Sequence, residues 1–139
     1  MRAGIVGLVA LMAAGCGNGE AAAEMSDELN YVRSGGIAGE HDELTVQPDG
    51  RATLTVRGGG EEQIRLSDEE LDDLRGALDG SGLQDVPSDS ASSRPVPDAF
   101  SYTITYGDKE VRTDDASNPD ELTELIGVLD GIVEAHRPR

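Results

Sequence analysis

Hydrophobic and polar residues alternate on both sides of one short turn signal. Apolar side chains occupy every second position at 44–47 and again at 52–57, and Asp49-Gly50 lies between the two runs. Strict alternation is typical of a half-buried strand, and Asp-Gly tolerates the positive φ angles of a type I′ turn. The pattern therefore predicts a β-hairpin. Structure is expected to begin near Leu29, and residues 63–66 are a candidate for a further short strand.

A second alternating run lies at 100–106, where every aromatic residue falls in the same phase and serine and threonine fall in the other. This predicts a strand that presents all its aromatic side chains on one face. Gly107-Asp108 suits a type II′ turn, which places a partner strand at 109–113.

Two segments carry helix signals. Ser67 to Glu70 form a capping box, and the leucines that follow recur at helical spacing until Gly80 and Gly82. A second helix is predicted over Asn118 to Ala135, with Asn118 as the N-cap and Pro119 as the first helical residue. Its apolar residues follow the i, i+3, i+4, i+7 rule, and three acids are assigned to the opposite, polar face: Glu124, Asp130 and Glu134.

The order of these elements is strands, helix, hairpin, helix, and strands with one apolar face need a cover. We therefore predict an α+β fold, an antiparallel sheet of four to six strands with two amphipathic helices packed on one face. The connection at 83–97 is rich in proline and serine, and a connection of that length is usually functional or disordered.

The N-terminal segment resembles a bacterial lipoprotein leader. Arg2 precedes an apolar stretch too short to span a bilayer, and small residues at 13–15 lead into Cys16, the one cysteine of the chain. We expect a signal peptide at 1–15, an acylated Cys16, a polar tether at 16–27 and a folded domain at 28–136, held at the extracytoplasmic face of a bacterial membrane. The alternative is an ordinary signal peptide that leaves Cys16 as a stray thiol.

Composition excludes several classes of partner. The formal net charge is -17, and a surface of that sign repels nucleic acid and anionic lipid headgroups. With one cysteine the chain cannot form an internal disulfide, so a packed core of Leu, Ile and Val must stabilise it.

The motifs of common enzymes are missing from the sequence. Glu40 to Glu43 form the only cluster of acids with a histidine, and one imidazole gives no fixed metal geometry, so we interpret it as a solvated loop. His136 is expected at the frayed end of the last helix, and the serines lack a spaced histidine to act as a base. We predict a protein that is not an enzyme and carries no cofactor or metal.

The segment from Tyr31 to Gly39 stands out, because three glycines and small neighbours follow Arg33, a planar donor fork. Glycines permit unusual backbone angles and close approach to a partner. On the residues alone, a bulged or kinked first strand is the favoured interpretation.

A resemblance to a known family favours binding instead. The chain resembles the emfourin family of protealysin inhibitors in the Tyr-x-Arg-Ser-Gly-Gly-x-Ala-Gly segment, in Val46 to Arg51, in Leu66 to Leu71 and in Pro97 to Gly107. Val111 to Thr113 and the helix from Pro119 to Leu129 follow in the same order, although Ile37 stands where the family more often has Phe.

The resemblance implies a protein inhibitor that occludes the active-site cleft of a thermolysin-like zinc metallopeptidase, and we expect it to be monomeric. A non-inhibitory envelope lipoprotein, which binds another ligand or acts as a scaffold, is the alternative. The implied contact residues are Arg33, Ser34, Gly35, Gly36, Ile37, Ala38, Gly39, Pro97 and Asp98.

Overall fold

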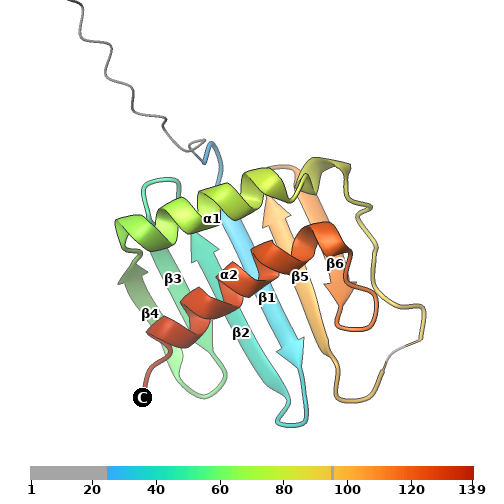
Figure 1. Cartoon of the computed structure of the whole chain (residues 1–139). Coiled ribbons are helices and arrows are strands. Elements are labelled where there is room, and N and C mark those ends of the chain that lie inside the picture. Colours follow the sequence, from blue (N-terminus) through green and yellow to red (C-terminus); the bar gives the residue numbers. More distant parts are fainter. Residues whose placement is uncertain (1–24, 95) are drawn as a thin grey trace, which may run out of the picture.

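The computed structural model describes residues 25–94 and 96–139, so the predicted signal peptide, Cys16 and most of the tether lie outside the described residues. The described chain forms one open six-stranded antiparallel sheet with the strand order β4-β3-β2-β1-β5-β6. Both α-helices lie on the same face of the sheet (Figure 1). The predicted α+β fold is confirmed. The elements are β1 Leu29–Gly35, β2 Glu40–Val46, β3 Arg51–Val56, β4 Gly60–Arg65, α1 Asp68–Gly80, a 3-10 turn η1 Leu83–Asp85, β5 Phe100–Tyr106, β6 Lys109–Asp114 and α2 Asp120–His136.

The core lies between the sheet and the two helices. Alternate residues of the central strands point into it, and Leu29, Leu44 and Leu54 are fully buried there. The helices contribute the apolar faces that their periodicity predicts, including Leu74 of α1 and Leu129 of α2. The opposite face of the sheet carries polar and β-branched side chains, as expected for a two-layer domain with one uncovered sheet face.

The first predicted hairpin forms, but its turn differs from the prediction. Gln47 N–H donates to Arg51 O, and Gly50 N–H donates to Gln47 O, which closes a three-residue loop. Gly50 has φ 87°, whereas Asp49 does not have a positive φ. A type I′ turn needs a positive φ at both residues, so the prediction of a type I′ turn is wrong. Pro48 favours a type I turn, which Gly50 completes as a bulge. The Gly107-Asp108 turn has a positive φ at Gly107 alone, as a type II′ turn requires.

The segment at 40–43 corrects a second prediction, because it belongs to β2 and is not a solvated loop. Asp42 shares the phase of Leu44 and Val46, so its side chain points into the core and is 1% exposed. The strand predicted at 63–66 forms as part of β4, which starts earlier, at Gly60, and ends at Arg65, so Leu66 follows it.

The capping box of α1 is confirmed in both directions, since Glu70 N–H donates to Ser67 Oγ and Ser67 N–H donates to the Glu70 carboxylate. At α2 the predicted N-cap, Asn118, is wrong by one residue. Pro119 is the N-cap, and the Asn118 side chain makes no capping hydrogen bond but contacts Thr123 Oγ1 instead.

The connection at 83–97 is structured over much of its length. After η1, residues 88–90 run along the free edge of β6, where Arg112 N–H donates to Ser88 O and Ser90 N–H donates to Arg112 O. Within residues 25–94 and 96–139, no helix has the length and apolar character needed to cross a membrane.

Candidate functional site

Two predicted site segments, about sixty residues apart in the sequence, meet at one end of the sheet. Gly35 at the end of β1 pairs with Phe100 at the start of β5. One residue further, Gly36 N–H donates to Ala99 O across 3.4 Å. The loop at 36–39 and the loop at 96–99 therefore lie side by side, at the lower end of the sheet in Figure 1. We call these two loops together the tip.

The first loop of the tip is a tight β-turn. Gly39 N–H donates to Gly36 O across 3.1 Å, which places Ile37 and Ala38 at the two central positions. The Ile37 side chain is 91% exposed, although most other large apolar side chains of the described residues are buried. Isolated exposed apolar residues are common on proteins, but an aliphatic side chain at the apex of a turn is well placed to enter a partner's pocket.

The second loop of the tip is also a β-turn, closed by Ala99 N–H donating to Val96 O. Pro97 occupies its first central position, and Asp98 at the second has φ 66°. This is the angle that a type II turn requires and that glycine or asparagine usually supplies. Asp98 is the single non-glycine residue with a positive φ in the described part of the chain. Val96 is 50% exposed beside it.

Two of the glycines serve packing within the chain. A Cβ on Gly36 would lie 2.8 Å from Phe100 Cζ, and one on Gly35 would overlap Ala99 O, while both residues have positive φ angles. The strand ladder thus needs glycine at these positions whether or not a partner binds. Ser34 lies on the uncovered face, paired with His41 and Ser101.

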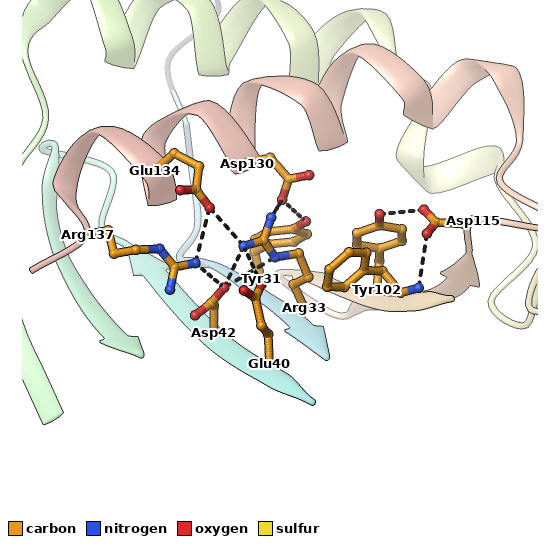
Figure 2. A network of polar contacts seen from close by, with 10 residues as sticks. Tyr31, Arg33, Glu40, Asp42, Tyr102, Asp115, Asp130, Glu134 and Arg137 are labelled. Carbon is orange, nitrogen blue, oxygen red and sulfur yellow. Dashed lines mark hydrogen bonds and ion pairs between the residues drawn. The ribbon is translucent and has the colours of Figure 1, made fainter. Parts of the chain in front are cut away.

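Arg33 lies in the core and not on the contact surface that the resemblance implies, with 7% of the residue exposed. It shares the phase of Leu29 and Tyr31 on β1, so its guanidinium points under α2. It donates to Asp42 from Nε (3.2 Å) and Nη2 (2.7 Å). Figure 2 shows these contacts together with those to the helix.

The same guanidinium holds α2 to the sheet. Arg33 Nη1 lies 3.2 Å from Asp130 Oδ1, and Nη2 lies 3.0 Å from Glu134 Oε1. Asp130 also accepts from the Tyr31 hydroxyl at 2.6 Å. The assignment of Asp130 to a separate polar face is therefore wrong, because it is partly buried against the sheet, whereas Glu134 stays 57% exposed and only its carboxylate reaches Arg33.

A second arginine completes the network. Arg137 Nη2 donates to Asp42 Oδ2 at 2.8 Å and to Glu134 Oε1 at 3.1 Å. Two arginines thus face Asp42, Asp130, Glu134 and, at 3.4 Å from Arg33, Glu40. Asp42 Oδ1 is buried and accepts no hydrogen bond within the described part of the chain.

The network shifts the titration of its members. Hydrogen bonds from Arg137 and Arg33 hold the pKa of Glu134 below its usual value. Burial raises the pKa of Asp130 and outweighs the hydrogen bond from Tyr31 and the Arg33 charge, both of which lower it. Burial, together with the hydrogen bond to Asp130, raises the pKa of the Tyr31 hydroxyl. These shifts follow from partly buried ion pairs and need no reaction to explain them.

Aromatic side chains connect this network to the tip. The Arg33 guanidinium lies 5.2 Å from the centre of the Phe100 ring, and Tyr31 stacks on Tyr102 with 6.3 Å between ring centres. Tyr102 donates to Asp115 Oδ1 at 2.6 Å, and Phe100 N–H donates to Oδ2 of the same residue at 3.0 Å. The tip therefore rests on Phe100, which the buried network in turn supports.

The two histidines lie apart from each other, on different elements. His41 is exposed on β2, and His136 Nε2 lies 2.9 Å from Glu70 Oε1, which joins the end of α2 to the start of α1. His136 is therefore tied to α1 and is not simply at a frayed helix end. Over residues 25–94 and 96–139, no group of three or more His, Cys, Asp or Glu side chains is arranged to hold a metal ion.

No family model matches the chain, and no characterised protein is found to be similar to it.

Proposed function

We propose that this protein is a lipid-anchored inhibitor of a thermolysin-like zinc metallopeptidase and that the tip enters the active-site cleft of that enzyme. The observation that carries the proposal is the pairing of two tight turns at one end of the sheet, with Ile37 91% exposed at the apex. The sequence resemblance supports the same segments, since both turns lie in its most specific motifs.

The shape of the tip suits a cleft. Neighbouring strands are about 4.8 Å apart, so two adjacent turns make a protrusion only a few backbone widths across. An inhibitor that fills a substrate cleft must present such a narrow protrusion. Ile37 supplies an apolar anchor, and the turn at 96–99 adds a second contact through Val96 and Asp98.

The position of the tip also suits an anchored inhibitor. Met25, where the described chain begins, lies near Tyr106 at the end of the sheet opposite the tip. An acylated Cys16 stands nine residues before Met25, a distance of at most about 30 Å when fully extended. An anchor on that side would leave the tip facing away from the membrane.

Charge favours the encounter with an enzyme of opposite potential. The chain carries a net charge of -17, and Glu40 and His41 lie directly beside the first turn. An acidic inhibitor is steered toward a cation-bearing cleft, and added salt should slow the association.

The test is a titration of a thermolysin-like metallopeptidase with the unacylated chain from residue 17 onward. Wild type should inhibit it, and Ile37→Asp should weaken inhibition at least 100-fold, because it places a charge in an apolar pocket. Gln63→Asp is the matched control, since it adds the same charge on the exposed strand β4 and should inhibit as wild type does. A wild-type chain that inhibits no enzyme of the class would overturn the proposal.

One observation favours the alternative, an envelope lipoprotein that binds another ligand. A pocket of about 250 Å³ lies between the start of the described chain and the end of α1, lined by Met25, Leu78, Leu83 and Tyr106 among others. Its volume suits a small apolar molecule. A thermal shift with apolar small molecules, abolished by Leu83→Trp, would support that function.

A further inference from the structure

Most backbone carbonyls of the first turn of the tip are already engaged. Gly36 O accepts from Gly39 N–H at 3.1 Å. Arg57 Nη1 donates to Ala38 O at 2.8 Å and also to Gly39 O. Of the four carbonyls at 36–39, Ile37 O is the one with no hydrogen bond among the described residues.

Arg57 is fixed for this contact by the sheet. It follows β3 directly, and its N–H donates to His41 O at 2.9 Å, which extends the ladder between β2 and β3. Gly39 has φ 61°, and a Cβ there would lie 2.7 Å from Arg57 Nη1. A glycine at 39 therefore allows the guanidinium to lie directly against the turn backbone.

We infer that Arg57 is a positioning residue that holds the tip as a closed turn, so that a bound metallopeptidase is blocked and does not cut the loop. This inference rests on the proposed function, which it extends from the site of binding to the reason that binding inhibits.

The chemistry of peptide hydrolysis gives the reason. The catalytic metal must reach and polarise the carbonyl oxygen of the bond to be cut. A water oxygen then attacks the carbonyl carbon, the C–N bond breaks, and the leaving amine takes up a proton. In the closed turn, three carbonyl oxygens are occupied by donors within the chain, and the backbone is bent, unlike an extended substrate. Loss of Arg57 would free two of these carbonyls and let the loop open.

A purely structural arginine would behave differently. Removing it would change the thermal midpoint but leave the loop uncut and the inhibition lasting. The experiment therefore measures cleavage and the duration of inhibition as well as stability.

We would compare wild type with Arg57→Ala and Arg57→Lys, and use Arg51→Ala as the control. Arg51 lies at the other end of β3 and pairs with exposed Asp49. Each chain is incubated in slight excess with a thermolysin-like metallopeptidase. The peptidase activity is followed for several hours, and the mass of the chain is then measured by mass spectrometry to detect cleavage. Wild type and Arg51→Ala should inhibit throughout and stay intact. Arg57→Ala should inhibit at first and then release activity, with cuts between residues 36 and 40 appearing at least tenfold faster, while Arg57→Lys falls between.

The outcomes separate the two proposals. Lasting inhibition by an uncut Arg57→Ala chain would overturn the role of Arg57 and leave the proposed function standing. If wild type inhibits no enzyme of the class, the proposed function fails. In that case limited digestion by a broad-specificity serine protease still decides whether Arg57 closes the turn, and equal rates of cutting at 36–40 in wild type and Arg57→Ala would overturn it.

Discussion

Arg33 and Asp42 form a buried ion pair in which two nitrogens of the guanidinium approach the same carboxylate oxygen, Nη2 at 2.7 Å and Nε at 3.2 Å. The pair joins β1 to β2, where the two residues are direct neighbours in the register. Their side chains are 9% and 1% exposed. Such a pair stabilises little relative to an apolar replacement, but leaving one member without the other is costly.

Asp42→Ala should therefore destabilise the domain by about 3 kcal/mol, at the lower end for a broken buried pair because Asp130 and Glu134 still face Arg33. Chemical denaturation measures the change. Asp49→Ala is the control, since it removes an exposed ion pair with Arg51 and should lower the stability far less. Equal effects of the two variants would contradict the role given to the buried pair.

Truncating the core side of α2 should have an effect of similar size. Leu125 and Leu129 are both fully buried, and changing either to alanine should cost about 2–5 kcal/mol of unfolding free energy. Glu124→Ala, on the exposed side of the same helix, should have little effect. A loss below about 1 kcal/mol at Leu129 would mean that α2 does not depend on this contact with the sheet.

The fold could be predicted because each element carries its own local signal. Alternation at 44–47, 52–57 and 100–106, the capping box at Ser67 and the apolar stripe of the last helix all depend on near neighbours in the sequence. The same phase argument would also have placed Asp42 and Arg33 inside, since each alternates with buried apolar residues. Their burial is nevertheless hard to predict, because charged residues are rarely buried without partners, and the partners lie on other elements.

The candidate site was less predictable for the same reason. The contact between Gly36 and Ala99 depends on the register of β1 against β5, which a connection as long as 83–97 leaves open in the sequence. The bonds from Arg57 to the turn and the contacts of Asp130 and Glu134 with Arg33 are likewise long-range. No periodicity within a single segment specifies them.

Acid should weaken the network through Glu134. Its pKa is lowered by hydrogen bonds from Arg137 and Arg33 relative to the usual value of 4.5. A group with a lowered pKa stabilises the folded state above the unfolded pKa, and that contribution is lost as the pH falls through the folded value. The thermal midpoint of wild type should therefore decrease as the pH is lowered below about 4.5. The Glu134→Gln variant should lose part of this pH dependence. Glu124→Gln is the control, and a wild-type profile identical to that of Glu134→Gln would refute the assignment.

The anchor is tested in cells. If Cys16 carries acyl chains, metabolic labelling with a fatty acid should mark wild type and not Cys16→Ser, and only wild type should sediment with membranes. Two or three acyl chains give stable attachment, whereas one chain alone is marginal. A wild-type protein that carries no label, or that is released freely from cells, would leave Cys16 as the stray thiol of an ordinary secreted protein.

Asp98 offers a test that separates stability from binding. Its φ of 66° is unfavourable for a residue with a Cβ, so Asp98→Gly should stabilise the domain by about 1 kcal/mol in chemical denaturation. Asp108→Gly is the control, because Asp108 follows Gly107 in a tight turn without a positive φ of its own and should gain nothing. Strained residues persist where the surroundings or a function require them. Since Asp98 lies in the tip, the Asp98→Gly variant should inhibit less well than wild type while being more stable. Asparagine tolerates the same φ angle, so Asp98→Asn should show whether the carboxylate charge contributes to inhibition. If Asp98→Gly is no more stable than wild type, the claim that Asp98 is strained is refuted. If it inhibits as well as wild type does, Asp98 is not part of the contact surface.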